Sequence, residues 1–246
     1  MKTIFLGTRS AQPSVNGQSS CCAVEVGESL YLIDAGAPII QGLLSVGKEM
    51  KNLKAIFITH THMDHIANLP AFLDLTNWCV KEVELTCYLP EQNIIDWLKQ
   101  GISLTESCAL DEKRIKLMNY NSDFVYNDGK VKVSFFINGH LKWANRPSYS
   151  ILFESENKKI FFSGDLSLHL QRNDFPTYVL ENQTDMFVLE YSHIDIEDIQ
   201  KFLPNIKTKC LVLNHIKERD YDQITQIKNK FSYQIILSKD GQMIEV

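Results

Sequence analysis

The sequence predicts a layered α/β protein in which sheets face each other and helices cover the outside. Short runs rich in β-branched and aromatic residues alternate with helical patterns along the chain, which contains no long linker, repeat or low-complexity stretch. Metal-binding residue types follow several of these runs. With 246 residues, of which 44% are hydrophobic, the chain is long enough to bury a full core. We therefore expect one domain, residues 1–246, with two sub-halves.

The first half of the chain predicts four strands and two helices. Glycines punctuate the early β-rich runs, and apolar residues at three- and four-residue spacing mark the helices. The predicted strands are KTIFLG (2–7), SCCAVEV (20–26), LYLID (30–34) and the buried LKAIFIT (53–59). The predicted helices are APIIQGLLSVGKEM (37–50) and LPAFLDLTNWCV (69–80).

The second half predicts a three-strand meander followed by alternating strands and helices. The meander consists of KVKVSFFI (130–137), SYSILFE (148–154) and KKIFFSG (158–164). After it come the strand DMFVLE (185–190), the helix IEDIQKFL (196–203), the strand CLVLNH (210–215), the helix YDQITQIKNKF (221–231) and the strands YQIILS (233–238) and QMIEV (242–246).

Composition excludes some classes of protein. The apolar runs are far shorter than the roughly 20 residues of a membrane span, and the first residues do not read as a signal peptide, so we expect a cytoplasmic protein without a membrane partner. The six cysteines form no C-x-x-C pair and are expected to be reduced thiols. A net charge of −5 counts against a broad nucleic-acid surface, although Lys207, Lys209, Lys217 and Arg219 could form a local basic patch.

The stretch ITHTHMDHIANLP (58–70) contains three of the seven histidines, within the six residues from His60 to His65. In an extended chain the alternation of side chains points His60 and His62 to the same side, and Asp64 and His65 can then turn toward an adjacent point. This pattern indicates two neighbouring metal ions. Three further residues of metal-binding type also follow predicted strands, and such strand ends collect ligands in α/β folds: His140, Asp165 and His215. An isolated histidine of this kind is more often a hydrogen-bonded loop residue, but the whole set favours a metal site.

The segment from His60 to His65 resembles the H-x-H-x-D-H signature of the metallo-β-lactamase-fold hydrolases. The segments YLIDAG, NGH, FFSGDL and LVLNH resemble the family's other motifs in the same order, so the resemblance covers essentially the whole chain. It implies a four-layer αββα sandwich with a dinuclear site. Carried over, one zinc ion would bind His60, His62 and His140, and the other would bind Asp64, His65 and His215. Asp165 would bridge them, and Asp34 would orient ligands.

The donor set favours zinc, with manganese or iron as alternatives. Two metals about 3.5–4 Å apart activate a shared water and neutralise charge in the transition state. The flanks FLGTRSAQPSVNGQSSCCAVEV and HTHMDHIANLP resemble ribonuclease Z and its phosphodiesterase relatives. We therefore expect a phosphodiesterase that acts on a small-molecule or short, single-stranded nucleotide phosphodiester through a metal-bridging hydroxide. The alternatives are an ester, thioester or lactone hydrolase, a ribonuclease Z that processes tRNA 3′ ends, and a metal-dependent sensor or interaction module without useful turnover.

Two departures count against tRNA as the substrate. Arg9 and Asn68 stand where small glycines are usual in ribonuclease Z, and no long Gly/Pro-rich arm is present. Transfer RNA is therefore a disfavoured partner, and a homodimer is left open.

The catalytic candidates are Asp64, Glu190 and His193. Glu190 and His193 follow a predicted strand in FVLEYSHIDIEDIQKF, where ribonuclease Z relatives carry a glutamate and a histidine that helps protonate the leaving group. The spacing differs, and His193 is as readily the polar start of the next helix. If so, Asp64 or a metal-bound water would donate the proton instead.

Overall fold

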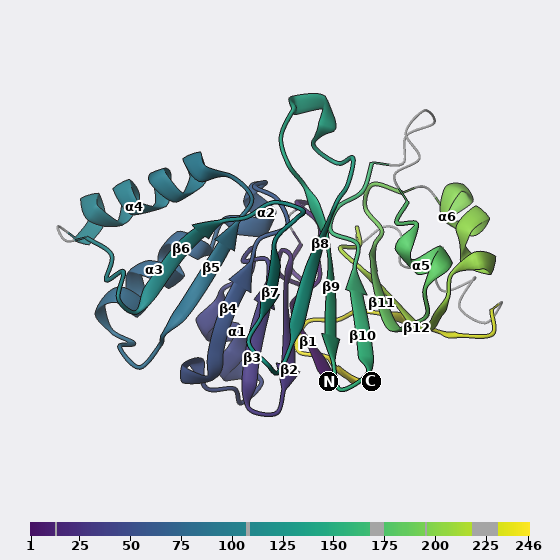
Figure 1. Ribbon diagram of the computed structural model, residues 1–246, viewed down its shortest axis with the longest axis horizontal. Helices are drawn as coiled ribbons and strands as arrows, with labels where there is room; N and C mark the ends of the chain where they lie inside the picture. Colours follow the sequence, from purple (N-terminus) through teal and green to yellow (C-terminus); the bar gives the residue numbers. More distant parts are fainter. Residues whose placement is uncertain (13, 107–108, 168–174, 195, 218–230) are drawn as a thin grey trace. The chain divides into compact units, whose positions relative to one another are not determined.

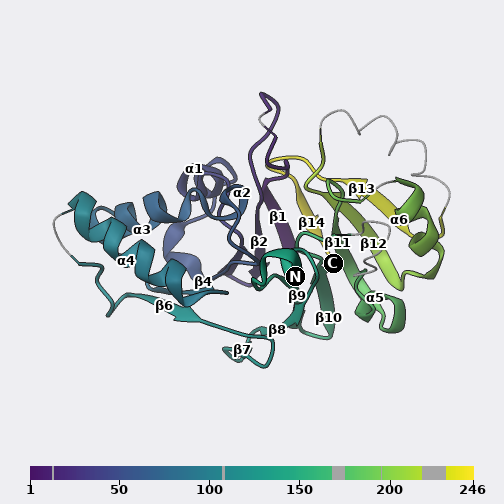
Figure 2. The same cartoon turned by 90° about the horizontal axis from the view of Figure 1, so that it is seen from above.

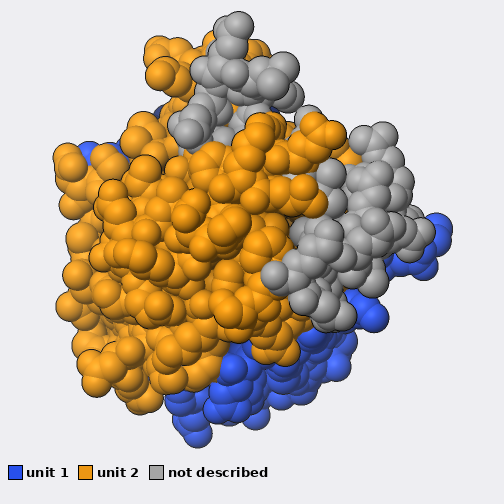
Figure 3. Space-filling view, turned by 90° about the vertical axis from the view of Figure 1, so that its right-hand side faces the viewer, with its two compact units in different colours: residues 1–11, 15–121, 239–245 blue, residues 12–14, 122–238, 246 orange. Residues whose placement is uncertain are grey.

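The computed structural model describes residues 1–246 except 13, 107–108, 168–174, 195 and 218–230. The chain divides into two compact units, coloured separately in Figure 3. Unit 1 comprises residues 1–11, 15–121 and 239–245, and unit 2 comprises residues 12–14, 122–238 and 246. Among the described residues, each unit carries one mixed sheet of seven strands. That the two units form one domain remains a prediction.

The sheet of unit 1 is antiparallel at one side and parallel at the other (Figure 1). Its strands, in spatial order, are β14 (Met243–Glu245), β1 (Lys2–Gly7), β2 (Cys21–Val26), β3 (Ser29–Ile33), β4 (Leu53–Phe57), β5 (Leu85–Leu89) and β6 (Ile115–Asn119). The pairings from β14 to β3 are antiparallel, and those from β3 to β6 are parallel. The residues after β3 and β4 therefore emerge at the same edge of the sheet.

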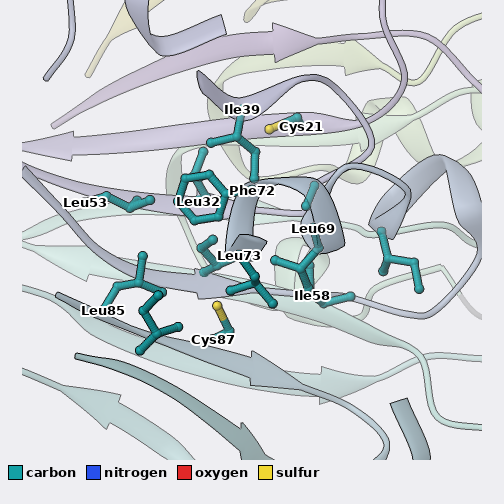
Figure 4. Packing of buried hydrophobic residues seen from close by; sticks show 14 of the residues in the cluster. Cys21, Leu32, Ile39, Leu53, Ile58, Leu69, Phe72, Leu73, Leu85 and Cys87 are labelled. Atoms are coloured by element: carbon teal, nitrogen blue, oxygen red, sulfur yellow. The ribbon is translucent and has the colours of Figure 1, made fainter. Parts of the chain in front are cut away.

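The helices of unit 1 are α1 (Ile39–Ser45), the short α2 (Met63–Ile66), α3 (Leu69–Trp78) and α4 (Gln92–Glu106), with a 3₁₀ turn at Met50–Asn52. Figure 2 shows α3 and α4 on the same side of β6. Their apolar stripes are buried against the strands, and Figure 4 shows Phe72 of α3 beside Leu32 of β3, and Leu73 beside Cys87 of β5. This packing fixes the segment that joins β4 to α3, which carries the histidine motif.

The sheet of unit 2 is also antiparallel at one side and parallel at the other. Its strands, in spatial order, are β13 (Gln234–Leu237), β12 (Thr208–Asn214), β11 (Thr184–Glu190), β10 (Lys158–Phe162), β9 (Tyr149–Ser155), β8 (Lys132–Ile137) and β7 (Val125–Asn127). The pairings from β13 to β10 are parallel, and those from β10 to β7 are antiparallel. The helical elements are α5 (Tyr178–Glu181), α6 (Ile196–Phe202) and 3₁₀ turns at Lys142–Ala144 and Leu203–Asn205.

Most predicted elements are present, including the meander, which is β8, β9 and β10. The helix predicted over 37–50 was too long, because α1 ends at Ser45. Just after this end, the backbone N–H of Lys48 donates a hydrogen bond to the Leu43 carbonyl. The helix predicted over 221–231 lies, but for Phe231, outside the described residues. Strands β5, β6 and β7 and helix α4 were not predicted. No helix in the described part of the chain is long and apolar enough to cross a membrane.

Candidate metal centre

Unit 1 gathers its predicted ligands immediately after β4. The ring centroids of His60 and His62 are 4.7 Å apart, and those of His60 and His65 are 4.1 Å apart. An Asp64 carboxylate oxygen lies 3.6 Å from Nε2 of His65. His60 and His65 are buried, whereas His62 and Asp64 are half-buried. The four side chains thus form one compact group of imidazoles and a carboxylate.

Asp34, the residue after β3, holds this group in place through contacts with Thr59 and His65. Its buried carboxylate accepts hydrogen bonds from the Thr59 backbone N–H at 2.8 Å and from the Thr59 hydroxyl at 3.0 Å. Its second oxygen lies 2.7 Å from Nδ1 of His65. An Nδ1–H that donates to this carboxylate places the imidazole lone pair on Nε2, which is the usual arrangement behind a metal-binding histidine. Asp34 has a φ of 63°, an uncommon left-handed conformation of the kind found near functional sites.

Gly36 allows the loop after β3 to touch the helix that carries Asp64 and His65. A Cβ atom on Gly36 would lie 1.8 Å from the Asp64 carbonyl oxygen, so only glycine fits here. The Ala35 N–H donates to the His65 carbonyl at 2.6 Å. Asn68, which stands where a glycine was expected, donates from its side-chain amide to the Gly36 carbonyl. The departure at Asn68 therefore adds a hydrogen bond that holds this loop to the start of α3.

Unit 2 gathers its predicted ligands around Asp165. One Asp165 carboxylate oxygen lies 3.8 Å from Nε2 of His140, and the other lies 3.6 Å from Nδ1 of His215. All three side chains are buried. Gly164, which precedes Asp165, has a φ of 58°, and a Cβ there would lie 2.4 Å from the Tyr149 carbonyl oxygen. The tight Ser-Gly-Asp turn after β10 therefore sets the position of the carboxylate.

His140 is tied to that same turn through Asn138. The backbone N–H of His140 donates to the Asn138 side-chain oxygen at 3.2 Å, and the Asn138 amide donates to the Ser163 carbonyl at 3.3 Å. The loop after β8 and the turn after β10 are thereby held in register.

Glu190 lies in this cluster, but it is chiefly engaged with the backbone. Its buried carboxylate accepts hydrogen bonds from the N–H groups of Leu166 at 3.0 Å, Ser192 at 2.6 Å and His193 at 3.1 Å. One oxygen lies 3.3 Å from Nδ1 of His193. This geometry is that of a carboxylate that orients the loop after β11 and polarises His193.

His193 is half-buried and lies close to the imidazoles of His140 and His215. Its ring centroid is 4.8 Å from that of His140 and 5.8 Å from that of His215. Burial lowers the pKa of His193, but the hydrogen bond and negative charge of Glu190, together with Asp165, outweigh it and raise the pKa above its usual value. Glu190 and Asp165 therefore favour the protonated form of this imidazole relative to an ordinary histidine.

Ser192 is a member of the cluster that the sequence did not reveal. Its hydroxyl oxygen lies 2.8 Å from Nδ1 of His215 and 3.2 Å from Nδ1 of His193. The Lys217 ammonium donates to its backbone carbonyl at 2.6 Å. Ser192 therefore orients His215 as Asp34 orients His65. Its only signal in the sequence was its place next to His193.

The predicted residues thus form two groups, one in each unit. His60, His62, Asp64 and His65 come together in unit 1, and His140, Asp165, Glu190, His193 and His215 come together in unit 2. Each group combines imidazoles with carboxylates, the donors that bind transition metals. In both groups Nδ1 of a histidine faces a protein oxygen, which fits ligation through Nε2.

Solved structures share this fold over the whole chain. YhfI from Bacillus subtilis, a metallo-β-lactamase-fold protein, matches with a TM-score of 0.77 and 18% identity, covering 100% of this chain and 99% of that one. The short form of human tRNase Z matches at 0.76 with 20% identity and the same coverage. A diphosphatase of the PhnP family matches at 0.73 with 17% identity, covering 100% and 97%. The predicted fold class, the αββα sandwich of the metallo-β-lactamase fold, is confirmed.

Curated relatives of the chain include ribonucleases Z. That of an Exiguobacterium species is 27% identical over 199 residues, covering 80% of this chain and 64% of the relative. That of Methanocaldococcus jannaschii is 29% identical over 240 residues, covering 87% and 73%. The chain thus spans just under two thirds of the first of these proteins.

The fold and the two ligand groups place the chain among the proteins of the metallo-β-lactamase fold. Within that class, the family model of the anti-Pycsar protein Apyc1 matches residues 1–237. The chain belongs to the Apyc1 family.

Proposed function

We propose that the chain is a dinuclear-zinc phosphodiesterase that acts on a small or single-stranded phosphodiester. The observation that carries this proposal is the pair of imidazole and carboxylate groups, in each of which a buried oxygen lies within hydrogen-bond distance of Nδ1 of a histidine. Ribonuclease Z among the relatives supports a phosphodiester bond as the target. The chain's net charge of −5 favours a small substrate over a long polyanion.

We propose the ligand sets that the resemblance implies. One zinc would be held by His60, His62 and His140, and the other by Asp64, His65 and His215, with Asp165 between them. Manganese and iron remain alternatives because both accept nitrogen and oxygen donors. When bound, the metals supply an activated water as nucleophile and Lewis-acid stabilisation of the phosphoryl oxygens.

The chain's own residues supply orientation and a proton. The Asp34 carboxylate favours the His65 tautomer that presents Nε2, and the Ser192 hydroxyl orients the ring of His215. Glu190 raises the pKa of His193 and holds its ring in place, and His193 is the proposed donor of a proton to the leaving oxygen. Asp64 is the alternative donor. Glu190 in this scheme positions His193 and does not touch the substrate.

The family name supports a cellular role. Apyc1 is named as an anti-Pycsar protein, and we propose the same role for this chain, exercised through phosphodiester hydrolysis in the cytoplasm. On this proposal, the chain counteracts a Pycsar system in cells that carry one, and His60→Ala abolishes this effect. If the variant counteracted the Pycsar system as well as the parent does, the role would not depend on the metal centre.

A substrate panel tests the proposed activity. Phosphodiesters, lactones, thioesters and tRNA precursors are assayed with zinc or manganese, and the proposal predicts turnover of small phosphodiesters above all others. Preferred turnover of a lactone or thioester would assign the chain to carboxylic ester chemistry. Cleavage of tRNA at its 3′ end under physiological salt would favour a ribonuclease Z instead. No turnover by fully metal-loaded protein would favour a sensor or interaction module.

A further inference from the structure

The segment that carries His60 and His62 is connected, within unit 1, to residues that follow β5 and β6. Thr61, between the two histidines, is buried, and its hydroxyl donates to the Glu91 carboxylate at 2.8 Å. Glu91 follows β5, is half-buried, and lies outside every motif that indicated the metal centre. This hydrogen bond therefore joins the histidine motif to a part of the chain that the motif does not contain.

The core of unit 1 fixes the position of Glu91. This residue directly precedes α4, whose side chains Ile95, Leu98 and Ile102 are buried in that core. Removing a carboxylate from water is costly unless it is hydrogen-bonded, and hydrogen bonds to an ionised acceptor are stronger than those between neutral groups. The bond from Thr61 therefore ties the ligand segment to a carboxylate whose backbone position is set by the packing of α4.

Tyr120, the residue after β6, makes a second connection to this segment. Its side chain is buried, and its hydroxyl donates at 2.7 Å to the carbonyl of Ile58, which shortly precedes His60. Its backbone N–H donates to the Leu89 carbonyl at the end of β5, at 3.1 Å. The Ile58 N–H in turn donates to the Tyr88 carbonyl at 3.0 Å. Tyr120 therefore ties the chain after β4 to the ends of β5 and β6.

We propose that Glu91 and Tyr120 are positioning residues of the metal centre, an inference that rests on the zinc ions of the proposed function. Glu91 acts through Thr61 and Tyr120 acts through Ile58, and both set the position of residues 60–62. Neither residue binds zinc or touches the substrate in this scheme. Because the partners behind metal ligands contribute to metal affinity, loss of either hydrogen bond weakens zinc binding without removing a ligand.

Zinc affinity, measured by competition with a chelating dye, tests the bond between Thr61 and Glu91. Thr61→Val and Glu91→Ala each remove this bond and should weaken zinc binding by about 10- to 100-fold. The double variant should bind zinc no more weakly than the weaker single variant, because both substitutions remove the same interaction. Glu91→Gln keeps an acceptor oxygen and should bind zinc nearly as the parent does. Glu82→Ala, in the exposed turn before β5, is the control and should leave the affinity unchanged.

Tyr120→Phe tests the second connection, because it removes only the hydroxyl. It should weaken zinc binding about tenfold, at the low end of the same range. Tyr233→Phe is the matched control, since the Tyr233 hydroxyl also donates to a backbone carbonyl at 2.7 Å, that of Leu203 in unit 2. Both substitutions should lower the urea midpoint, because each leaves a carbonyl without its donor. Only Tyr120→Phe should change the zinc affinity.

The role of Glu91 is overturned if Glu91→Ala binds zinc as the parent does, and that of Tyr120 if Tyr120→Phe does so. A loss of stability alone would make both residues structural. Glu91→Gln binding zinc as weakly as Glu91→Ala would also overturn the proposal, because charge and not the hydrogen bond would then be responsible. These measurements need no substrate. A parent protein that binds zinc but hydrolyses no phosphodiester would contradict the proposed function alone, so the two failures are distinguishable.

Discussion

Two buried carboxylates, Asp34 and Glu190, have corresponding roles at the residue level. Each follows or ends a buried strand, accepts backbone N–H donors from the loop that carries a predicted site residue, and lies near Nδ1 of a histidine. Burial without such partners would be costly for a carboxylate, so these hydrogen bonds both stabilise the charge and fix the loop. The resemblance identified Asp34 as an orienting residue, whereas Glu190 was taken for a catalytic one.

Asp34→Asn should weaken zinc binding by about 10- to 100-fold, the usual cost of losing the partner behind a metal-binding histidine. Asparagine keeps the shape and tolerates the left-handed backbone at this position, so the change removes mainly the negative charge beside His65. Competition with a chelating dye measures the affinity. Asp96→Asn, on the exposed side of α4, is the control and should bind zinc as the parent does. Unchanged affinity in Asp34→Asn would contradict an orienting role.

His193→Ala should slow hydrolysis of a diester with a poor alkoxide leaving group by about 10²–10⁴-fold, the range for lost general acid catalysis. A nitrophenolate leaving group needs little protonation, so its rate should fall far less. Comparing the two rates separates proton donation from damage to the metal centre, which would slow both alike. Equal losses with unchanged zinc content would make His193 a residue that positions substrate, and Asp64 would become the candidate donor.

At the level of elements, the site depends on loops that are held where strands end. The loop after β3 fits against α2 because Gly36 has no side chain, and the turn after β10 reaches Asp165 through Gly164. These contacts are backbone contacts, so they depend on the absence of a Cβ atom more than on side-chain chemistry.

Gly36→Ala should destabilise the protein by about 1–3 kcal/mol, the typical cost of forcing an extra group into a packed site. It should also reduce zinc occupancy, because the new Cβ would displace the Asp64 backbone. Urea unfolding and elemental analysis measure the two effects. Gly101→Ala is the control, because outside the neighbouring backbone of α4 nothing lies within 4 Å of the new Cβ, and it should stabilise by about 0.5–1 kcal/mol. Similar effects of the two substitutions would contradict the proposed close contact.

Asp185 links three strands of unit 2 and should make stability depend on pH. It accepts hydrogen bonds from Lys209 of β12 and from the Lys159 N–H of β10. Burial raises the pKa of its carboxyl, but these bonds and the charges of Lys209 and Lys158 outweigh burial and leave the pKa below its ordinary value. A lowered folded pKa contributes stability above the unfolded value of about 3.9, and this contribution is lost as pH falls through the folded pKa.

Asp185→Asn should therefore lower the urea midpoint at pH 7, and its difference from the parent should shrink as the pH falls below about 4. Urea titrations of both proteins across this pH range provide the measurement. A difference that is constant with pH would mean that Asp185 acts through packing alone.

At the level of the whole molecule, the sequence predicted the class of fold and the ligand-rich loops, because both leave local signals. The meander and the buried strands show as apolar runs, and the ligands show as histidines after strands. The pairing of β14 with β1 had no such signal, because it joins residues from opposite ends of the chain. Ser192 was missed for a related reason: its role depends on a contact with His215, 23 residues away. Helix α4 had a detectable apolar stripe, Ile95, Leu98 and Ile102, that was overlooked.

The central claim is that phosphodiester hydrolysis requires the two proposed zinc ions. Zinc is added back to metal-free protein, and both the hydrolysis rate of a nitrophenyl phosphodiester and the bound zinc are measured at each step. The account predicts that the rate rises until about two ions are bound per chain. It also predicts that Asp165→Ala, still folded by circular dichroism, binds less zinc and loses turnover. Full activity of the metal-free protein would contradict this account. Full activity of Asp165→Ala with one ion bound per chain would contradict it as well.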